Sequence, residues 1–282
     1  MIREQIPFDY RVTESPNHAT EITAGLLKDH CNRIAVFGGD GTLNEVLQGL
    51  FRDRVSPPSG FQLLFLGGGS SCDFEKLFPR RRNYMDRLLD GETFVIDIGK
   101  VEFQGLDGSR CVRYFMNNSS IGVISLATEK FNHAEGFARL MKKLNVDAGA
   151  LVAGVQTLME FEGFGCRLTI DGEPVQEFHL SNLTVFKSPY FAGGMNYGVQ
   201  TQLDDGLLYV AVIDARSRLK MFRLIPSLYT GNIFQLEGTL LKRCTSLELE
   251  SDEKVVIDTD GEIIGYPPLS YSVLKRVLTV IM

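Results

Sequence analysis

The sequence predicts an α/β fold, with an N-terminal open α/β domain that carries a GGDGT phosphate loop, followed by a mostly antiparallel β-sandwich domain. Three observations support this prediction. Strand-like and helix-like runs alternate over the first hundred residues, as in an open α/β sheet. Glycine-rich turns follow two of the strand-like runs, at 38–41 and 67–69. From about Thr93 onward, strand-like runs succeed one another and are separated by turn residues.

The first elements of the α/β domain are a strand and a helix. Residues 8–12, FDYRV, predict a strand. Ser15-Pro16 predicts the start of a helix that reaches about Asp29, because serine suits the N-cap and proline the first helical position. The apolar run 33–37 then predicts a buried strand of a parallel sheet.

A second helix and a second buried strand follow. Residues 42–53 place apolar side chains at the i, i+3, i+4, i+7, i+8 spacing of a helix with one buried face. Residues 61–66 predict the strand, and the polar run 70–73 predicts another helix start. We therefore expect a nucleotide-binding α/β domain over residues 1–96.

Residues 97–282 predict a β-rich domain. Its strand-like runs, the first of which begins just before the boundary, are 94–103, 113–125, 166–173, 179–187, 206–214, 247–262 and 272–282. Two further segments, 133–160 and 218–231, predict helical insertions.

Composition excludes several classes of protein. The net charge of −6 disfavours a protein that wraps nucleic acid, and 44% hydrophobic residues indicate a globular chain. Five scattered cysteines without a CxxC pair argue against a disulfide scaffold or a zinc site. The start is unlike a signal peptide and no apolar run approaches the roughly 20 residues that span a bilayer, so we expect a cytoplasmic protein without a transmembrane segment.

The strongest local motif is GGDGTLNEVLQGL, residues 38–50. A buried strand ends at Phe37, and glycines then allow the backbone to approach a ligand closely. Thr42 and Glu45 have the spacing of a capping box, so the loop amides and the positive helix end would face one phosphate. A carboxylate at Asp40 beside a phosphate predicts Mg²⁺ between them; the alternative is a tight turn with Asp40 at a polar position.

The motif is neither a Walker A loop nor the dinucleotide G-x-G-x-x-G. GGDGTLNEV resembles the nucleotide loop of the diacylglycerol kinase and sphingosine kinase family. NAD kinases carry a related GGDGT, so this loop alone leaves both substrates open.

Further segments resemble motifs of the lipid-kinase family in the same order. Thr13-Glu14 with His18-Ala19 resembles T-E-x-x-x-H-A, and residues 69–73 stand in place of G-T-x-N-D, with Cys72 where asparagine is usual. The remaining matches are Asp97 in D-x-G, Phe115-Met116-Asn117, Ile121-Gly122, Gly193-Gly194-Met195, residues 203–208 (LDDGLL) and residues 258–262 (DTDGE).

The resemblance implies an ATP-dependent kinase that phosphorylates a diacylglycerol-like or sphingoid lipid, with ATP and Mg²⁺ as cofactors. Asp97 would join the magnesium network behind Asp40 and Asp73. The implied nucleotide-binding residues are Thr13, Gly38, Gly39, Asp40, Gly41, Thr42, Leu43, Asn44, Ser70 and Asp73.

Two acidic segments of the β domain have implied roles. Asp205, with the carbonyls of Gln202 and Leu207, would hold a structural Mg²⁺; from the residues alone, a hairpin turn is the alternative. Asp260 and Glu262 are the candidates for activating the acceptor hydroxyl, together with Asp40 as a catalytic residue. Asp171-Gly172-Glu173 is the same tripeptide as 260–262 and is interpreted as a plain turn.

The expected partner is a lipid at the membrane surface, where the protein would be transiently peripheral, and not a nucleic acid. Residues 149–161 either line a groove for the acyl chain or pack on the core. Residues 80–82 with Arg87 form a basic cluster that either touches anionic groups or is a solvated loop.

One family motif is missing. Family members begin with a strand that ends in an N-P-x-S-G-like turn, and this chain starts at what should be the second strand. Three explanations are open: the start is misassigned or trimmed, another piece supplies the strand, or the protein has lost strong ATP binding. The sheet edge would then be open, which makes a homodimer conceivable. The alternatives to a lipid kinase are a catalytically weak lipid- or nucleotide-binding regulatory relative, and an NAD kinase-like enzyme.

Overall fold

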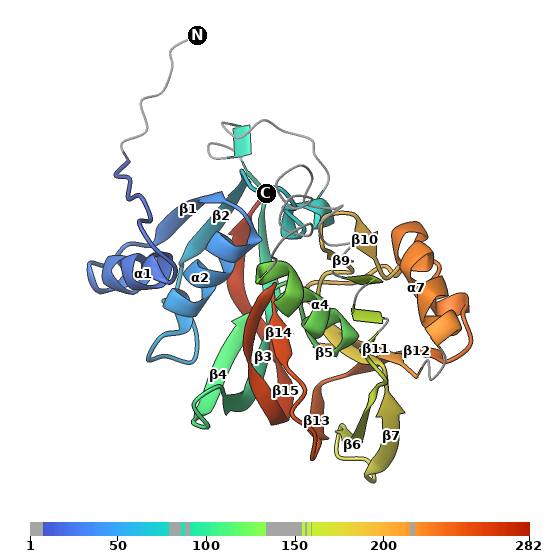
Figure 1. Ribbon diagram of the computed structural model, residues 1–282. Helices are drawn as coiled ribbons and strands as arrows, with labels where there is room; N and C mark the ends of the chain where they lie inside the picture. Colours follow the sequence, from blue (N-terminus) through green and yellow to red (C-terminus); the bar gives the residue numbers. More distant parts are fainter. Residues whose placement is uncertain are drawn as a thin grey trace.

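A computed structural model describes residues 8–78, 86–87, 91–133, 154–155, 157–158, 160–214 and 218–282. Its N-terminal layer contains β1 (Arg33–Gly38) and β2 (Gln62–Gly67), which pair in parallel, as expected for two buried strands. Helices α1 (His18–Lys28) and α2 (Asp40–Phe51) lie side by side next to these strands (Figure 1). The apolar stripe of α2 is buried at Leu43, Leu47 and Leu50, which confirms the predicted helix face.

The strand predicted at 8–12 is wrong. Residues 8–12 have no regular structure, and Phe8, Tyr10 and Val12 are exposed. The physical reason is that the segment buries no apolar face: its exposed side chains give no hydrophobic gain to offset the entropy of ordering it on the free edge of β1. Within the described residues, β1 pairs with β2 alone.

The predicted capping box is also wrong. Helix α2 begins at Asp40 with Gly39 as its N-cap, two residues before Thr42. Glu45 instead accepts hydrogen bonds from the backbone amides of Asn17 at 2.8 Å and Ala19 at 3.0 Å, so it caps α1 across the layer. Likewise the polar run 70–73 leads into a short 3₁₀ helix, η1 (Phe74–Leu77).

The C-terminal part is built on antiparallel strands, as predicted. The described strands of the main sheet follow the order β12-β11-β8-β5-β14-β15-β13-β6-β7. Their bounds are β5 (Asn118–Gly122), β6 (Phe164–Ile170), β7 (Gln176–Leu180), β8 (Asn182–Phe186), β11 (Leu208–Ile213), β12 (Thr239–Cys244), β13 (Ser246–Glu250), β14 (Ile257–Thr259) and β15 (Glu262–Ile281).

Strand β15 joins the two parts of the chain. It pairs with β13, with β14 and with β3 (Thr93–Gly105), which in turn pairs with β4 (Arg110–Phe115). Its last residues then pair in parallel with β2, so Thr279 lies opposite Gln62. The C-terminal end of the chain therefore belongs to the same layer as the N-terminal strands.

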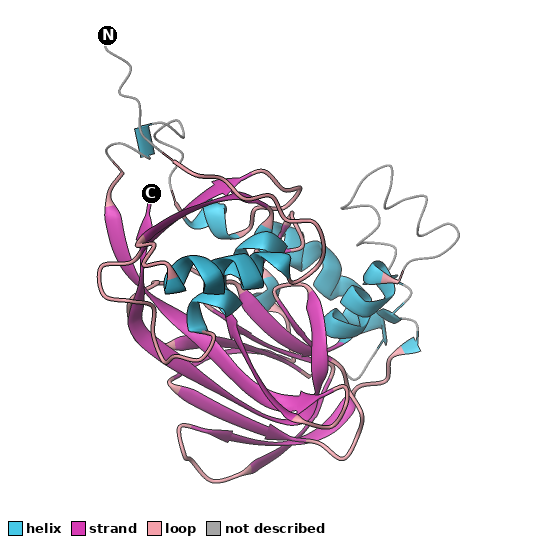
Figure 2. Cartoon of the chain, turned by 90° about the vertical axis from the view of Figure 1, so that its left-hand side faces the viewer, coloured by secondary structure: helices cyan, strands magenta, loops and turns pink. Residues whose placement is uncertain are grey.

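Two helices lie against the strands of the β domain, α4 next to β5 and α7 next to β10 (Figures 1 and 2). Helix α7 (Arg218–Thr230) agrees with the predicted insertion. Helix α4 (Val123–Asn132) begins inside the predicted strand-like run 113–125, which therefore ends at Gly122. Most of the predicted insertion 133–160 lies outside the described residues. The remaining short elements are β9 (Tyr190–Phe191), β10 (Met195–Asn196) and η2 (Ile233–Gln235).

Candidate functional site

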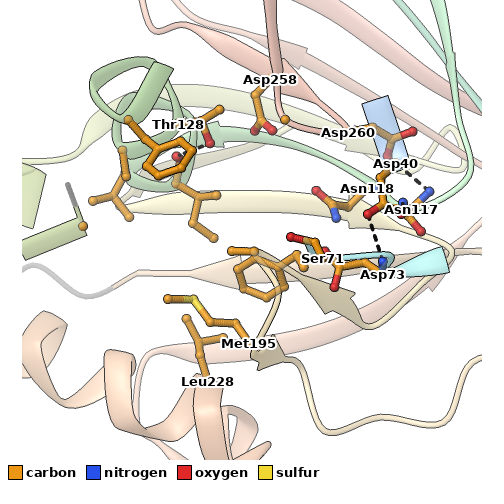
Figure 3. Close-up of a pocket in the computed structure, with 18 of the residues that line it drawn as sticks. Asp40, Ser71, Asp73, Asn117, Asn118, Thr128, Met195, Leu228, Asp258 and Asp260 are labelled. Atoms are coloured by element: carbon orange, nitrogen blue, oxygen red, sulfur yellow. Dashed lines mark hydrogen bonds between the residues drawn. The ribbon is translucent and has the colours of Figure 1, made fainter. Parts of the chain in front are cut away.

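A cavity of about 430 Å³ connects the glycine loops with the β domain (Figure 3). Its polar end is formed by residues from both parts of the chain: Gly39, Asp40, Gly41, Gly69, Ser70, Ser71, Asp73, Asn117, Asn118, Asp258, Asp260 and Gly261. The loop after β1 and the acidic hairpin between β14 and β15 thus share one cavity, although more than 200 residues separate them in the chain.

The other end of the cavity is apolar. Helix α4 contributes Val123, Ile124, Ala127 and Phe131, and α7 contributes Met221, Leu224, Ile225 and Leu228. Phe191, Met195 and Ile213 complete this wall. Gly154 and Leu158, the described lining residues from 149–161, also belong to it, which agrees with the groove interpretation of that segment.

The two glycine loops are in direct contact. The amide of Gly68 donates to the carbonyl of Gly38 at 2.8 Å. A Cβ atom at Gly69 would overlap the Cα atom of Gly39, so a side chain at this position would push the loops apart. The glycines are therefore required here for close approach.

We expect Gly69→Ala to lower the free energy of unfolding by about 1–3 kcal/mol, because the overlap is with backbone and cannot be relieved by a rotamer change. The matched control is Gly25→Ala, at an exposed position of helix α1 where an added Cβ would meet no atom within 4 Å. This control should raise the free energy of unfolding by about 0.5–1 kcal/mol. Urea unfolding of both variants measures the difference. Equal free energies of unfolding for the two variants would contradict the close contact between the glycine loops.

Asp40 lies at the first turn of α2 and faces the start of η1. Its carboxylate accepts hydrogen bonds from the amides of Asp73 at 2.9 Å and Phe74 at 3.1 Å, and from the side-chain amide of Asn117 at 3.2 Å. The carbonyl oxygen Oδ1 of Asn117 is buried and has no hydrogen-bond partner in the part of the chain that the structure describes. A carboxylate beside an unsatisfied amide oxygen is a donor set that suits Mg²⁺.

Asp260 is held by four donors. Its carboxylate accepts from Asn44 Nδ2 at 2.7 Å and from the amides of Met116 at 3.4 Å, Asn117 at 3.2 Å and Asn118 at 3.0 Å. Burial raises the pKa of Asp260 to about 7, a nearby charge on Asp40 adds to the shift, and the hydrogen bonds oppose it. Asn117 contacts both carboxylates, so it joins the glycine loop to the hairpin.

Asp258 is a cavity residue that the sequence did not single out. Its side chain is buried, its Oδ1 has no hydrogen-bond partner among the described residues, and it lies toward Thr128 of α4 in Figure 3. Burial raises the pKa of Asp258 to about 7, and the charge of Asp260 adds to this. The available signal was its place two residues before Asp260 in DTDGE, since alternate residues of an extended segment share a face.

These two carboxyls predict a pH dependence of stability. The folded protein keeps their protons up to about pH 7, whereas the unfolded chain releases them near pH 4, so stability falls as pH rises from 4 to 7. We expect the melting temperature to fall between pH 5.5 and 7.5, and to fall less in Asp258→Asn, which removes one titrating group. Thermal melts across this range test it, and parallel curves for the two proteins would refute it.

Glu262 does not line the cavity. Its carboxylate lies 3.5 Å from Arg113 Nη2, and burial raises its pKa while Arg113 opposes the shift. Of the two hairpin candidates, Asp260 is therefore the one that the structure brings together with Asp40.

The other residues predicted to bind nucleotide divide into two groups. Gly39, Gly41 and Ser70 line the cavity. Gly38, Thr42, Leu43 and Asn44 support it from β1 and α2, where Leu43 and Asn44 are buried. Thr13 is exposed and does not line the cavity.

Asp73 links the α/β layer to the β domain. Lys76 Nζ contacts Asp73 Oδ1 at 2.6 Å and also the carbonyl oxygen of Gly193, and the Gly193 amide donates to Asp73 Oδ2 at 3.4 Å. Burial raises the pKa of Asp73, and the contact with Lys76 opposes this. The carboxylate of Asp73 is therefore engaged in this link.

The expected structural metal site has a different arrangement. Asp97, Asp205 and the carbonyl of Leu207 all accept hydrogen bonds from the side chain of Lys187, and Asp97 does not line the cavity that Asp40 lines. The backbone amide of Gln202 donates a hydrogen bond to the Tyr209 hydroxyl at 3.2 Å. No group of three or more His, Cys, Asp or Glu residues in the described ranges is arranged to hold a metal ion.

Arg87 fits neither interpretation of the basic cluster, because it is not solvated and contacts groups inside the fold. Arg87 is buried, pairs with Glu75 at 2.8 Å and donates to the carbonyl of Phe65 at 2.7 Å, so it stabilises the N-terminal layer. Residues 80–82 lie outside the described residues. Among the described helices, none combines the length and the apolar character needed to cross a bilayer.

Comparisons with known proteins agree with this architecture. Residues 1–101 match the model of the diacylglycerol kinase catalytic domain, and residues 120–282 match the model of the YegS C-terminal NAD kinase beta sandwich-like domain. A diacylglycerol kinase of Staphylococcus carnosus is 23% identical over 94% of this chain and 81% of its own length.

A diacylglycerol kinase of Mycobacterium tuberculosis is similar to the same degree, with 23% identity over 93% of this chain and 81% of that protein. Among solved structures, a diacylglycerol kinase from Bacillus anthracis superposes with a TM-score of 0.65 at 21% identity. The superposition covers 95% of this chain and 82% of that chain, and at this identity it shows a common fold.

Proposed function

Because the chain belongs to the diacylglycerol kinase catalytic-domain family of lipid kinases, we propose that it transfers the γ-phosphate of ATP to a hydroxyl group of a lipid. In this proposal residues 1–96 bind the nucleotide and residues 97–282 supply most of the lipid site. The observation that carries the proposal is the single cavity with a glycine loop at one end and an apolar wall at the other. The acceptor hydroxyl and the acyl chain belong to the same lipid molecule, so a lipid kinase needs a phosphate site and an apolar wall that adjoin each other.

The apolar wall supports a lipid rather than NAD as the acceptor. Side chains of α4 and α7 face each other across the cavity, and they offer no charged partner for a second nucleotide. A hydrocarbon chain gains about 0.8 kcal/mol for each methylene that it buries on such a surface.

The polar end supports binding of the ATP phosphates. The first amides of α2, at Asp40 to Thr42, have no acceptor within the helix and lie at its positive end. Asp40 and Asn117 Oδ1 would hold Mg²⁺, and the bound ion would neutralise charge on the phosphate oxygens. Asn117 also orients Asp40 and Asp260 relative to each other.

We assign proton removal from the acceptor hydroxyl to Asp260. Its pKa of about 7 is suited to a general base at neutral pH, and it lies in the cavity beside Asp40. Asp258 Oδ1 has no hydrogen-bond partner within the described ranges, and in this proposal it forms a hydrogen bond with the lipid headgroup.

A second candidate function rests on the hydrogen bonds of Asp40. Three donors already engage its carboxylate, and Thr13 does not line the cavity, which favours a weakly catalytic relative that binds lipid or nucleotide and regulates a partner. Calorimetry with ATP and Mg²⁺, followed by a turnover assay, distinguishes the two. Binding without turnover supports the regulator.

The lipid substrate implies that the protein works at a membrane surface, where we propose that it binds transiently from the cytoplasm. The exposed edge of β1 offers strand pairing to a second copy, as in a homodimer. Vesicle flotation and analytical ultracentrifugation measure these two properties.

The direct test of the proposed function is transfer of labelled γ-phosphate from ATP to a panel of diacylglycerol, sphingoid base, ceramide, phosphatidylglycerol and NAD. Label in a lipid product supports the proposal. Label in NAD alone, or in no acceptor although ATP binds, would refute it.

A variant of the cavity wall tests where the acyl chain lies. We expect Ala127→Phe to raise the KM for a long-chain lipid at least about tenfold, because the added ring occupies the cavity, with little change in the KM for ATP. Glu129→Phe, on the same helix but outside the lining, is the matched control. If both variants raise the KM for the lipid equally, the acyl chain binds outside this cavity.

A further inference from the structure

A buried lysine lies at the end of β8. Lys187 Nζ donates to the carbonyl oxygen of Leu207 at 2.8 Å, to Asp205 Oδ1 at 3.0 Å and to Asp97 Oδ2 at 3.1 Å. The side chains of Lys187 and Asp97 are fully buried, and that of Asp205 is 11% exposed. An ammonium group has three protons, so all three are used by these oxygens.

Two of these oxygens, those of Asp205 and Leu207, belong to the set that the family resemblance assigns to a structural Mg²⁺. Carboxylate and carbonyl oxygens do suit that ion, but it would have to approach them to about 2.0–2.1 Å. The ammonium nitrogen of Lys187 already contacts these oxygens. A Mg²⁺ ion bound to them would lie so close to the ammonium group that the two cations would repel each other strongly in a buried site. With Lys187 present, these residues do not fit a metal ion.

The remaining polar atoms of the cluster are satisfied within the chain. Asp97 also accepts from the amides of Gly206 at 2.7 Å and Arg276 at 2.9 Å. Asp205 accepts from the Tyr209 hydroxyl at 2.7 Å and the Leu207 amide at 3.0 Å. Burial opposes ionisation of Asp205, but the contacts with Tyr209 and Lys187 outweigh it and hold its pKa below the usual value. Within the described residues, every carboxylate oxygen of Asp97 and Asp205 therefore has a hydrogen-bond donor.

We propose that the ammonium group of Lys187 replaces a divalent metal ion as the brace of the β domain. It ties β8 to β3 through Asp97 and to the 202–207 turn through Asp205 and Leu207. The backbone connects this brace to the cavity, because the amides of Lys187 and Ser188 donate to the carbonyl of Asn117 at 2.8 and 3.1 Å. Stability of the fold is then independent of divalent ions, whereas phosphoryl transfer still requires them.

The experiment is thermal unfolding without nucleotide, in EDTA and in millimolar Mg²⁺, for the wild type and Lys187→Asn. We expect the wild type to melt at the same temperature in both buffers. Lys187→Asn leaves two buried carboxylates without their cation, so it should melt roughly 5–10 °C lower in EDTA. Its shorter side chain frees the oxygens, and Mg²⁺ should recover most of the loss.

The matched control is Lys220→Asn, which removes an exposed ion pair of 2.9 Å with Glu237 and should change melting by about 1 °C or less in either buffer. A wild type that loses several degrees in EDTA would overturn the proposal, even if Lys187→Asn does not fold. So would a Lys187→Asn protein that melts like the wild type or gains nothing from Mg²⁺. The readout is melting, so it is independent of whether the protein phosphorylates a lipid.

Discussion

Asp260→Asn is expected to reduce the turnover number for lipid phosphorylation by at least about 100-fold, with a small change in the KM for ATP. A general base contributes about 10²–10⁴-fold, and an amide cannot take the hydroxyl proton. The backbone of Asp260 has a φ of 48°, a left-handed conformation that asparagine tolerates, so the hairpin should keep its shape. Steady-state kinetics with labelled ATP measure the change.

The matched control for this variant is Glu262→Gln, two residues along the same hairpin. Glu262 faces Arg113 outside the cavity, so we expect its turnover number to stay within about threefold of the wild type. The pH–rate profile gives a second readout, since the ascending limb near pH 7 should vanish in Asp260→Asn. If Glu262→Gln loses activity and Asp260→Asn keeps it, the proton acceptor is Glu262.

Asp40→Asn is expected to lower kcat/KM by about 10³-fold, which corresponds to about 4 kcal/mol of transition-state stabilisation. The substitution removes the negative charge that would hold Mg²⁺ beside the phosphates. It also turns an amide group toward the backbone amides of Asp73 and Phe74, which now donate to the carboxylate. ATP consumption with a lipid acceptor measures the loss.

Melting curves show whether Asp40→Asn loses activity because the charge that would hold Mg²⁺ is gone or because the fold is destabilised. Asp204→Asn is the control, because this exposed aspartate pairs with Arg276 at 2.9 Å and lies outside the cavity. A folded Asp40→Asn protein with unchanged turnover would remove the glycine loop from the mechanism and favour the regulatory alternative.

Local patterns made much of the fold predictable. The strands 33–37 and 61–66 and the helix after GGDG were readable because each is a short run with its own apolar periodicity. The order of family motifs indicated that Asp40 and Asp260 act together, and both line the cavity in the structure.

What sequence could not provide depends on contacts between distant residues. Glu45 caps α1 instead of its own helix because α1 lies against α2. Residues 8–12 have strand-like composition but bury none of their apolar side chains, so they do not join the sheet. Nothing in the local sequence around Lys187 indicates that the fold brings it to Asp97, 90 residues earlier in the chain.

The central claim is that one cavity receives both the nucleotide phosphates and a lipid chain. Photocrosslinking with a lipid that carries a diazirine in its acyl chain tests this most directly, with labelled peptides identified by mass spectrometry. We predict labels on α4 and α7, and loss of labelling in Ala127→Phe but not in Glu129→Phe. Labels confined to other elements, or labelling that Ala127→Phe leaves unchanged, would contradict the account.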